Sequence, residues 1–260
     1  MRIGFIGTGT ITSAIVSGLN AANSTAFTFL LSPRNADVAA SLASAFDNVT
    51  VAASNQAVLD GCDIIMLAVR PQVASDVLES LRFRPDHHVI SLVALISVER
   101  VHALVAPADR VVRAIPLPMV ATRAGVTVIY PDDSTARAIF NHIGSTIALD
   151  SPEHFNAFST ATATMAPYFA FAAEITDWLS RQGVPSTTAR SYVGGVFHGL
   201  ATIAANPSAE PFPTLAEKFA TAGGINEQVM AHLTQVGALK AVSDALDGVL
   251  SRMTEASSAS

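Results

Sequence analysis

Cysteine and charged residues are both scarce in this chain, and each scarcity excludes a class of protein. Cys62 is the only cysteine among 260 residues, so no disulfide framework holds the fold and a reducing, cytoplasmic compartment is expected. Cys62 opens an apolar run, which favours core packing over a nucleophilic or ligand role. Charged residues make up 14% of the sequence and the net charge is −6, with basic residues scattered singly. We therefore expect neither a nucleic-acid partner nor an anionic membrane partner.

Long apolar runs and hydrolase or metal motifs are missing as well. No uninterrupted apolar run approaches the ~20 residues of a membrane span, and no signal-peptide cleavage site follows the apolar N-terminus. The seven histidines are dispersed without metal-ligand spacing, and no Gly-x-Ser-x-Gly elbow occurs. Glu174 and Asp177 share a side of an expected helix, where solvation or a subunit contact explains them better than paired acid/base chemistry. The apolar surplus suggests a large subunit interface.

The first twelve residues predict a strand, a glycine turn and the start of a helix. Residues 3–6 are apolar, and Ala14, Ile15 and Leu19 then recur at helical spacing. Free N–H groups and the helix dipole make such a helix start suited to a dinucleotide pyrophosphate. A glycine turn without a ligand is the structural alternative. The residues predicted to bind the cofactor here are Gly7, Thr8, Gly9, Thr10 and Ile11.

The second expected strand, residues 27–31, lacks the acid that usually follows it in NAD enzymes. An Asp or Glu at that place binds the ribose 2′-OH, but the chain has Leu31 and Ser32 there. Arg34, with Ser32 and Asn35 as small polar neighbours, would instead suit a 2′-phosphate. We therefore predict NADP(H) as the cofactor, in preference to NAD(H).

Strand and helix patterns alternate over the first half of the chain and then give way to helices. This pattern predicts an α/β fold: an N-terminal doubly wound, Rossmann-type, mostly parallel sheet, followed by a second, all-helical domain. A Ser-Pro-Glu helix start at residue 151 marks the boundary. We expect a dinucleotide-binding domain over 1–150, an all-α domain for dimerisation and substrate over 151–256 and a disordered tail over 257–260. Strands are expected at 3–6, 27–31, 49–51, 64–69, 88–92, 110–115, 125–130 and 146–149, with helices between most of them and four or five afterwards.

Further candidate segments follow the fourth and sixth strands and lie in the helical half. Val69, Arg70 and Pro71 come at the carboxyl edge of the sheet, where ligands bind, so Arg70 is placed near the cofactor; a solvated loop arginine is the alternative. Ala114-Ile115-Pro116-Leu117-Pro118 carries no proton-transfer group and would be a rigid wall or a structural turn. The small-residue loop from Thr221 to Glu227 opens onto a helix and could present backbone N–H groups to a carboxylate, although an ordinary turn would look the same.

In this order and at these spacings, the motifs resemble the pyrroline-5-carboxylate reductase family over nearly the whole chain. The opening glycine turn is similar to that of the family, and Thr221-Ala222-Gly223-Gly224 resembles its Ser-Pro-Gly-Gly loop. The matching segments between them are Val69-Arg70-Pro71-Gln72, Ser91-Leu92-Val93-Ala94, Arg113-Ala114-Ile115-Pro116, Ala124-Gly125-Val126-Thr127, Tyr168 with Glu174, and Gly183-Val184-Pro185.

The resemblance implies NAD(P)H-dependent reduction of a cyclic imine, Δ1-pyrroline-5-carboxylate, to proline, and so a role in proline biosynthesis. It also implies a homodimer through the helical domain, with a higher oligomer left open, and the substrate loop of one subunit beside the cofactor of the other. Backbone N–H groups around Gly223 and Gly224 would hold the substrate carboxylate, with Thr221 and Ile225 beside it. Asn226 is the candidate catalytic residue, placed to hydrogen-bond near the imine nitrogen.

Departures from the family pattern fall mainly where substrate would bind. Thr12 replaces the third glycine of the turn, but the other changes surround the expected substrate: Leu117-Pro118-Met119 for Asn-Thr-Pro, Met165 in the Pro-Ala-Tyr segment, and Ile225 with Asn226 after the glycine pair. An NADPH-dependent reductase of a different imine or of a carbonyl compound is therefore the first alternative. The second is a catalytically inactive NADP-binding protein.

Overall fold

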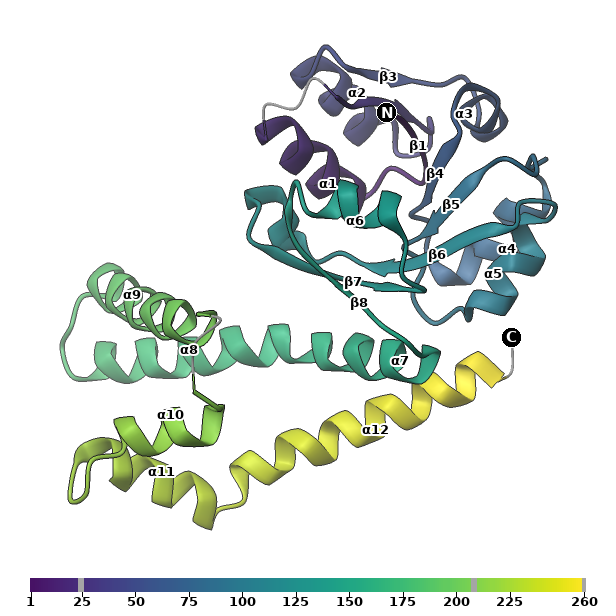
Figure 1. Ribbon diagram of the computed structural model, residues 1–260. Coiled ribbons are helices and arrows are strands. Elements are labelled where there is room, and N and C mark those ends of the chain that lie inside the picture. The colour runs from purple at the N-terminus through teal and green to yellow at the C-terminus, as the bar shows by residue number, and fades with distance from the viewer. Residues whose placement is uncertain (23–25, 207–209, 259–260) are drawn as a thin grey trace. The chain divides into compact units, whose positions relative to one another are not determined.

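The computed structural model describes residues 1–22, 26–206 and 210–258. It divides into two compact units, residues 1–159 with 251–260 and residues 160–250 (Figure 1). The compact units begin and end at residues other than those of the predicted domains, 1–150 and 151–256. The predicted domain ranges therefore stay a prediction. Residues 257 and 258, expected in a disordered tail, lie in the last helix, and 259–260 lie outside the described residues.

An eight-stranded sheet forms the first unit, in the order β3-β2-β1-β4-β5-β6-β7-β8 (Figure 1). β7 runs antiparallel to β6, and every other neighbouring pair is parallel. The order reverses direction between β1 and β4, which is the signature of a doubly wound sheet. The predicted α/β fold is therefore confirmed. The strands are β1 (Arg2–Ile6), β2 (Thr28–Leu31), β3 (Val49–Val51), β4 (Ile64–Leu67), β5 (His88–Ser91), β6 (Arg110–Ile115), β7 (Gly125–Tyr130) and β8 (Gly144–Ala148).

Helices cover both faces of the sheet. On one face, α1 (Thr10–Ala21), α2 (Ala36–Ala45), α6 (Ser134–Phe140) and the 3-10 helix η1 (Pro118–Thr122) contribute to one buried cluster. On the other, α3 (Asn55–Gly61), α4 (Pro71–Glu79) and α5 (Val98–Val105) contribute to a second. Cys62 lies in this second cluster, and burial raises the pKa of its thiol. Core packing, the role expected for Cys62, is thus what the structure shows.

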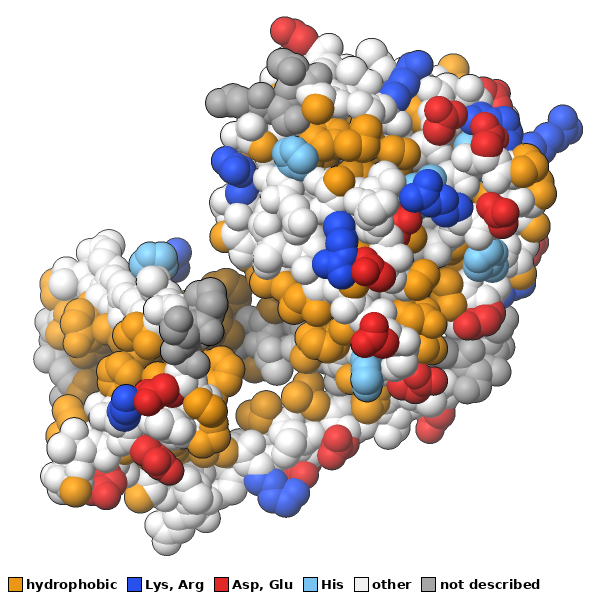
Figure 2. Space-filling view, in the orientation of Figure 1, with side chains coloured by type: hydrophobic (Ala, Val, Ile, Leu, Met, Phe, Trp, Pro, Cys, Tyr) orange, Lys and Arg blue, Asp and Glu red, His pale blue; other side chains and the backbone are white. Residues whose placement is uncertain are grey.

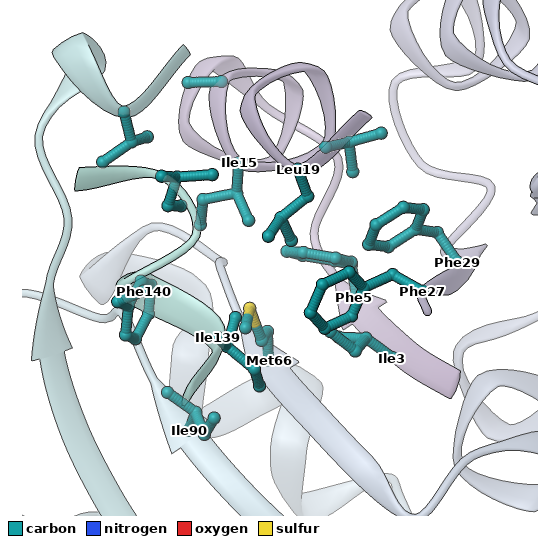
Figure 3. Close-up of a cluster of buried hydrophobic side chains, with 14 of the residues drawn as sticks. Ile3, Phe5, Ile15, Leu19, Phe27, Phe29, Met66, Ile90, Ile139 and Phe140 are labelled. Atoms are coloured by element: carbon teal, nitrogen blue, oxygen red, sulfur yellow. The ribbon is translucent and has the colours of Figure 1, made fainter. Parts of the chain in front are cut away.

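Aromatic side chains make the core under α1 dense. Phe5, Phe27 and Phe29 are all buried, and Ile15 and Leu19 extend from α1 toward them (Figure 3). Each fully buried large apolar side chain contributes about 1.5–3 kcal/mol relative to an exposed one. This packing fixes α1 against β1 and β2, and so fixes the helix start that follows the glycine turn.

The second unit is built from helices, and no strand follows β8 in the described part of the chain. A helix that links the sheet to this unit, α7 (Pro152–Ala161), buries Phe155 beside Val128 and Leu149 of the first unit. Apolar side chains lie exposed over the helical unit (Figure 2). Its helices are the short η2 (Thr162–Thr164), then α8 (Met165–Arg181), α9 (Ser186–Ala204), α10 (Phe212–Phe219), α11 (Ile225–Gln235) and most of α12 (Ala238–Ser258).

Gly18 lets α1 approach η1 closely. A Cβ atom at this position would overlap the carbonyl oxygen of Val120 and approach the Ile143 side chain at 2.9 Å. Because the obstacle at Val120 is backbone, it cannot rotate away as a flexible side chain could. We expect Gly18→Ala to lower the free energy of unfolding by about 1–3 kcal/mol, as overpacking does, despite the higher helix propensity of alanine.

Thermal or denaturant unfolding measures this change, and Ser17→Ala is the matched control. Ser17 lies beside Gly18 on the same helix and is only half-buried, so its variant should be as stable as the parent or slightly more. A Gly18→Ala protein that is as stable as the parent would contradict the close packing of α1 on η1.

Candidate functional site

The carboxyl ends of β1, β2 and β4 meet at one edge of the sheet, beside the point where the strand order reverses. β1 pairs with β2 on one side and β4 on the other. Ligands of open α/β sheets bind at this edge and at this point. The candidate cofactor residues on the three loops after these strands are thereby brought together on one edge, as their positions in the sequence predict.

Gly7 allows the chain to turn sharply between β1 and α1. Its φ is +102°, in the region that favours glycine, and a Cβ atom would lie 2.6 Å from the Ala68 carbonyl oxygen. Gly9, the N-cap of α1, has no side-chain cap, and nothing lies within 4 Å of the place a Cβ would take. The amides of Thr10 and Ile11 therefore begin the helix with open space before them. Both the shape of this turn and its free N–H donors suit a pyrophosphate.

Thr12, which stands where the family has a third glycine, adds a hydrogen bond to the turn. Its side chain is fully buried, and its hydroxyl donates to the Gly7 carbonyl oxygen at 2.8 Å. The substitution therefore ties the start of α1 to the residue with the unusual φ. Thr12 thus adds a hydrogen bond that stabilises the turn, and it leaves the space at Gly9 open.

Ser32 lies inside the turn and does not face solvent, which corrects its expected role. It is fully buried, and its hydroxyl accepts the Gly7 N–H at 2.9 Å. Thr8, also buried, donates to the Ser32 carbonyl oxygen at 2.8 Å. A direct side-chain contact between Ser32 and a 2′-phosphate does not fit this burial. Ser32 instead supports the glycine turn.

Arg34 and Asn35 are the exposed residues of this loop. Within the described part of the chain, no hydrogen bond or ion pair holds the Arg34 guanidinium. Asn35 has a φ of 63° and directly precedes α2 as its N-cap. Arg34 is thus a free cation at the end of β2, where a 2′-phosphate would lie in a Rossmann-type site.

The loop after β4 carries the remaining candidate cofactor residues, Val69, Arg70 and Pro71. Arg70 is the N-cap of α4 and is exposed, and Pro71 opens the helix at its first turn. Val69 is half-buried and packs against the core on the α4 side. The carboxyl edge therefore carries a second exposed arginine beside the glycine turn.

A buried arginine on β6 was not anticipated from the sequence. Arg113 is 4% exposed, and its guanidinium carbon lies 4.2 Å from the ring centroid of Phe155 on α7. Burial lowers its pKa to about 10, although Glu99 opposes the shift. The sequence signal is weak, because only the flanking apolar strand residues hint that this arginine is covered. Arg113 packs α7 onto the sheet just before Leu117 and Met119.

In the helical unit, the donors expected at Gly223 and Gly224 are already in use. The Gly223 N–H donates to a carboxylate oxygen of Glu227 at 2.7 Å, and the Gly224 N–H donates to the Thr221 carbonyl oxygen at 2.8 Å. In this conformation the two amides that were expected to hold a substrate carboxylate donate to groups of the protein itself. Glu227, the last residue of this loop, is the hydrogen-bond partner that the sequence pattern did not predict.

The first turn of α11 supplies the donors that remain. Gln228 makes the first intrahelical bond, to Gly224, so the amides of Ile225, Asn226 and Glu227 precede the helical ladder. The Ile225 side chain is 82% exposed. Asn226 donates through Nδ2 to the Phe219 carbonyl oxygen at 3.0 Å, which leaves Oδ1 able to accept a hydrogen bond.

Two family models match the chain, one over each part. Residues 2–95 match a model described as NADP oxidoreductase, coenzyme F420-dependent. Residues 152–256 match a model described as pyrroline-5-carboxylate reductase dimerisation. The helical part thus matches the dimerisation family of pyrroline-5-carboxylate reductases, and the first part of the sheet matches a family of NADP oxidoreductases. Both matches indicate an NAD(P)H-dependent oxidoreductase of the class that acts on CH–NH groups.

Relatives of this reductase match over almost their full length. A pyrroline-5-carboxylate reductase of Pseudomonas aeruginosa is 24% identical and covers 98% of this chain and 96% of its own. The structure of a reductase of that name from Streptococcus pyogenes superposes with a TM-score of 0.84 at 24% identity, covering 98% of both chains. A pyrroline carboxylate reductase of Plasmodium falciparum, solved with NADP bound, gives a TM-score of 0.82 at 18% identity over 99% of this chain and 98% of that one. These structures share the fold.

Neither a membrane-spanning helix nor a metal site occurs among the described residues. No helix among them is long and apolar enough to cross a membrane. No group of histidine, cysteine, aspartate and glutamate side chains within residues 1–22, 26–206 and 210–258 could hold a metal ion.

Arg34→Ala should weaken NADPH binding far more than NADH binding. A charge-assisted contact with the 2′-phosphate is at stake, and its loss costs about tenfold in affinity or more. Fluorescence titration of the purified reductase with each cofactor measures the two dissociation constants.

Arg82→Ala is the control for the loss of one positive charge. Arg82 lies in the segment before β5, at the amino end of the strands, so its variant should keep the parent's preference for NADPH. Equal losses of affinity for NADPH and NADH in Arg34→Ala would contradict the 2′-phosphate assignment.

Proposed function

We propose that this reductase converts a cyclic imine that carries a carboxylate, Δ1-pyrroline-5-carboxylate, to proline at the expense of NADPH. The observation that carries the proposal is the glycine turn, where a backbone that admits only glycine precedes free helix amides and an exposed arginine. The two family matches support the same substrate class. Proline biosynthesis and a cytoplasmic location are proposed with it.

When bound, NADPH would supply the hydride, and the protein would position the two reactants. The first-turn amides of α1 would hold the pyrophosphate, and Arg34 would hold the 2′-phosphate. A cyclic imine is basic enough to be protonated before hydride transfer, so positioning and electrostatics carry the reaction without a dedicated acid. The product amine then retains that proton.

The start of α11 is the proposed place for the substrate carboxylate. The amides of Ile225 and Asn226 are free of intrahelical bonds, and the helix dipole favours an anion there. The bond from Nδ2 to Phe219 leaves the Asn226 Oδ1 atom as an acceptor. A protonated imine nitrogen is a donor, so Asn226 has the polarity needed to receive it.

A homodimer through the helical part is proposed as the working form. Apolar side chains exposed on this part include Phe169, Tyr192 and Phe212, each more than 60% accessible in the single protomer. A soluble monomer rarely exposes so much apolar surface. A second copy of the chain would cover it, as the match to the dimerisation model suggests.

A different imine substrate is the second candidate, and two features at the start of α11 favour it. Glu227 places a carboxylate on the Gly223 amide, close to where an anionic substrate would bind. Ile225, which is 82% exposed, adds an apolar side chain at the same position. Both features would suit an imine that lacks a carboxylate better than one that has it.

Incubation of the purified enzyme with NADPH and pyrroline-5-carboxylate tests the proposal directly. We expect NADPH oxidation with an equal amount of proline formed. Turnover of neutral cyclic imines without proline formation would transfer the assignment to the second candidate. Tight NADPH binding without turnover of any imine would mean that catalysis has been lost.

Glu227→Gln should lower the KM for pyrroline-5-carboxylate by roughly threefold at low ionic strength, because it removes a like charge near the substrate carboxylate. Glutamine can still accept the Gly223 N–H, so the loop keeps its hydrogen bond. Steady-state kinetics against a neutral cyclic imine provides the control, and its KM should not change. The same shift for both substrates would indicate altered loop structure and would count against carboxylate binding at α11.

A further inference from the structure

Ser32 is fixed to the glycine turn through its backbone and its side chain. Its N–H donates to the Phe5 carbonyl oxygen at 3.0 Å, and its carbonyl oxygen accepts from the Thr8 hydroxyl at 2.8 Å. Its own hydroxyl accepts the Gly7 N–H at 2.9 Å and lies 3.1 Å from the Thr8 hydroxyl. Ser32 therefore cannot shift relative to Gly7 and Thr8 without breaking several bonds together.

Burial makes this arrangement costly to change. Thr8 and Ser32 are 3% and 0% exposed, so water cannot replace a lost partner. A buried polar group left without a hydrogen bond is penalised by its full desolvation cost, which exceeds the net value of the bond itself. The Thr8–Ser32 pair therefore holds one geometry between the turn and the end of β2.

The chain between this pair and Arg34 is short and stiff. Pro33 follows Ser32 and has a locked φ. Asn35 follows Arg34 in the left-handed region, and its carbonyl oxygen accepts the Ala39 N–H at 3.1 Å at the start of α2. Arg34 is thus held between Ser32 on one side and a packed helix on the other. Its distance from the glycine turn is set by the Thr8–Ser32 pair.

We propose that Thr8 and Ser32 are positioning residues that set the preference for NADPH over NADH. The pair holds the pyrophosphate turn and the Arg34 segment at the separation between a pyrophosphate and a 2′-phosphate on one molecule. The inference rests on the proposed 2′-phosphate contact of Arg34. It assigns selectivity to two hydroxyl groups that do not reach the phosphate.

Thr12 provides a matched control within the same turn. Its hydroxyl is also buried and also donates to a backbone carbonyl, that of Gly7, at 2.8 Å. It makes no contact with the segment that carries Arg34 among the hydrogen bonds of the described residues. Removal of the Thr12 hydroxyl should therefore disturb the pyrophosphate turn, which would bind NADPH and NADH alike.

The experiment measures dissociation constants for NADPH and NADH in Thr8→Val, Ser32→Ala and Thr12→Val, with folding verified by circular dichroism. We expect the ratio of the NADH constant to the NADPH constant to fall at least about fivefold in the first two, mainly through weaker NADPH binding. Thr12→Val should weaken both cofactors by similar factors and keep the ratio. Thr8→Ser, which retains the hydroxyl, should keep the ratio of the parent.

A double-mutant cycle separates this inference from the proposed function. In an Arg34→Ala background, Thr8→Val should no longer change the ratio, because the contact that it positions is gone. If Arg34→Ala leaves the ratio of the parent, the 2′-phosphate assignment itself fails. If Arg34→Ala abolishes the preference but Thr8→Val and Ser32→Ala do not alter it, only the positioning role is overturned. An equal change of the ratio in Thr12→Val would also overturn it, since the effect would then be general to the turn.

Discussion

The close approach of Gly7 to the backbone of Ala68 is the constraint on which the cofactor site depends. Because no Cβ fits there, the chain can leave β1, turn beside β4 and begin α1 with its amides open. Buried aromatic residues hold α1 on the sheet, and hydroxyl groups hold the turn to the end of β2. The arginines that follow β2 and β4 are exposed at the same edge of the sheet.

The sequence predicted the sheet well and the details of the site less well, for physical reasons. Buried parallel strands read as continuous apolar runs, so segments such as Ile64–Leu67 are visible without any structure. The burial of Ser32 is not visible, because it depends on a hydrogen bond to Gly7 on another strand-loop unit. Arg113 is hidden for a similar reason, since Phe155 covers it from a later helix.

Glu227 illustrates a different limit. It lies only four residues from Gly223, yet their bond requires the left-handed conformation of that glycine, with a φ of 72°. From the sequence alone, a glycine pair before a helix predicts free donors for an anion. Here the Glu227 carboxylate accepts the N–H of Gly223, so the proposed place for a substrate carboxylate is the first turn of the helix.

The exposed apolar faces of the helical unit have a consequence for how the protein folds. α8, α10 and α11, all of whose residues are described, contain no buried residue within one protomer. Helices of this length draw most of their stability from tertiary packing. In the proposed homodimer this packing would come from the second copy, so folding of this half and association would be one linked equilibrium. The stability of this half would then depend on protein concentration, and dilution would act on it as a denaturant does.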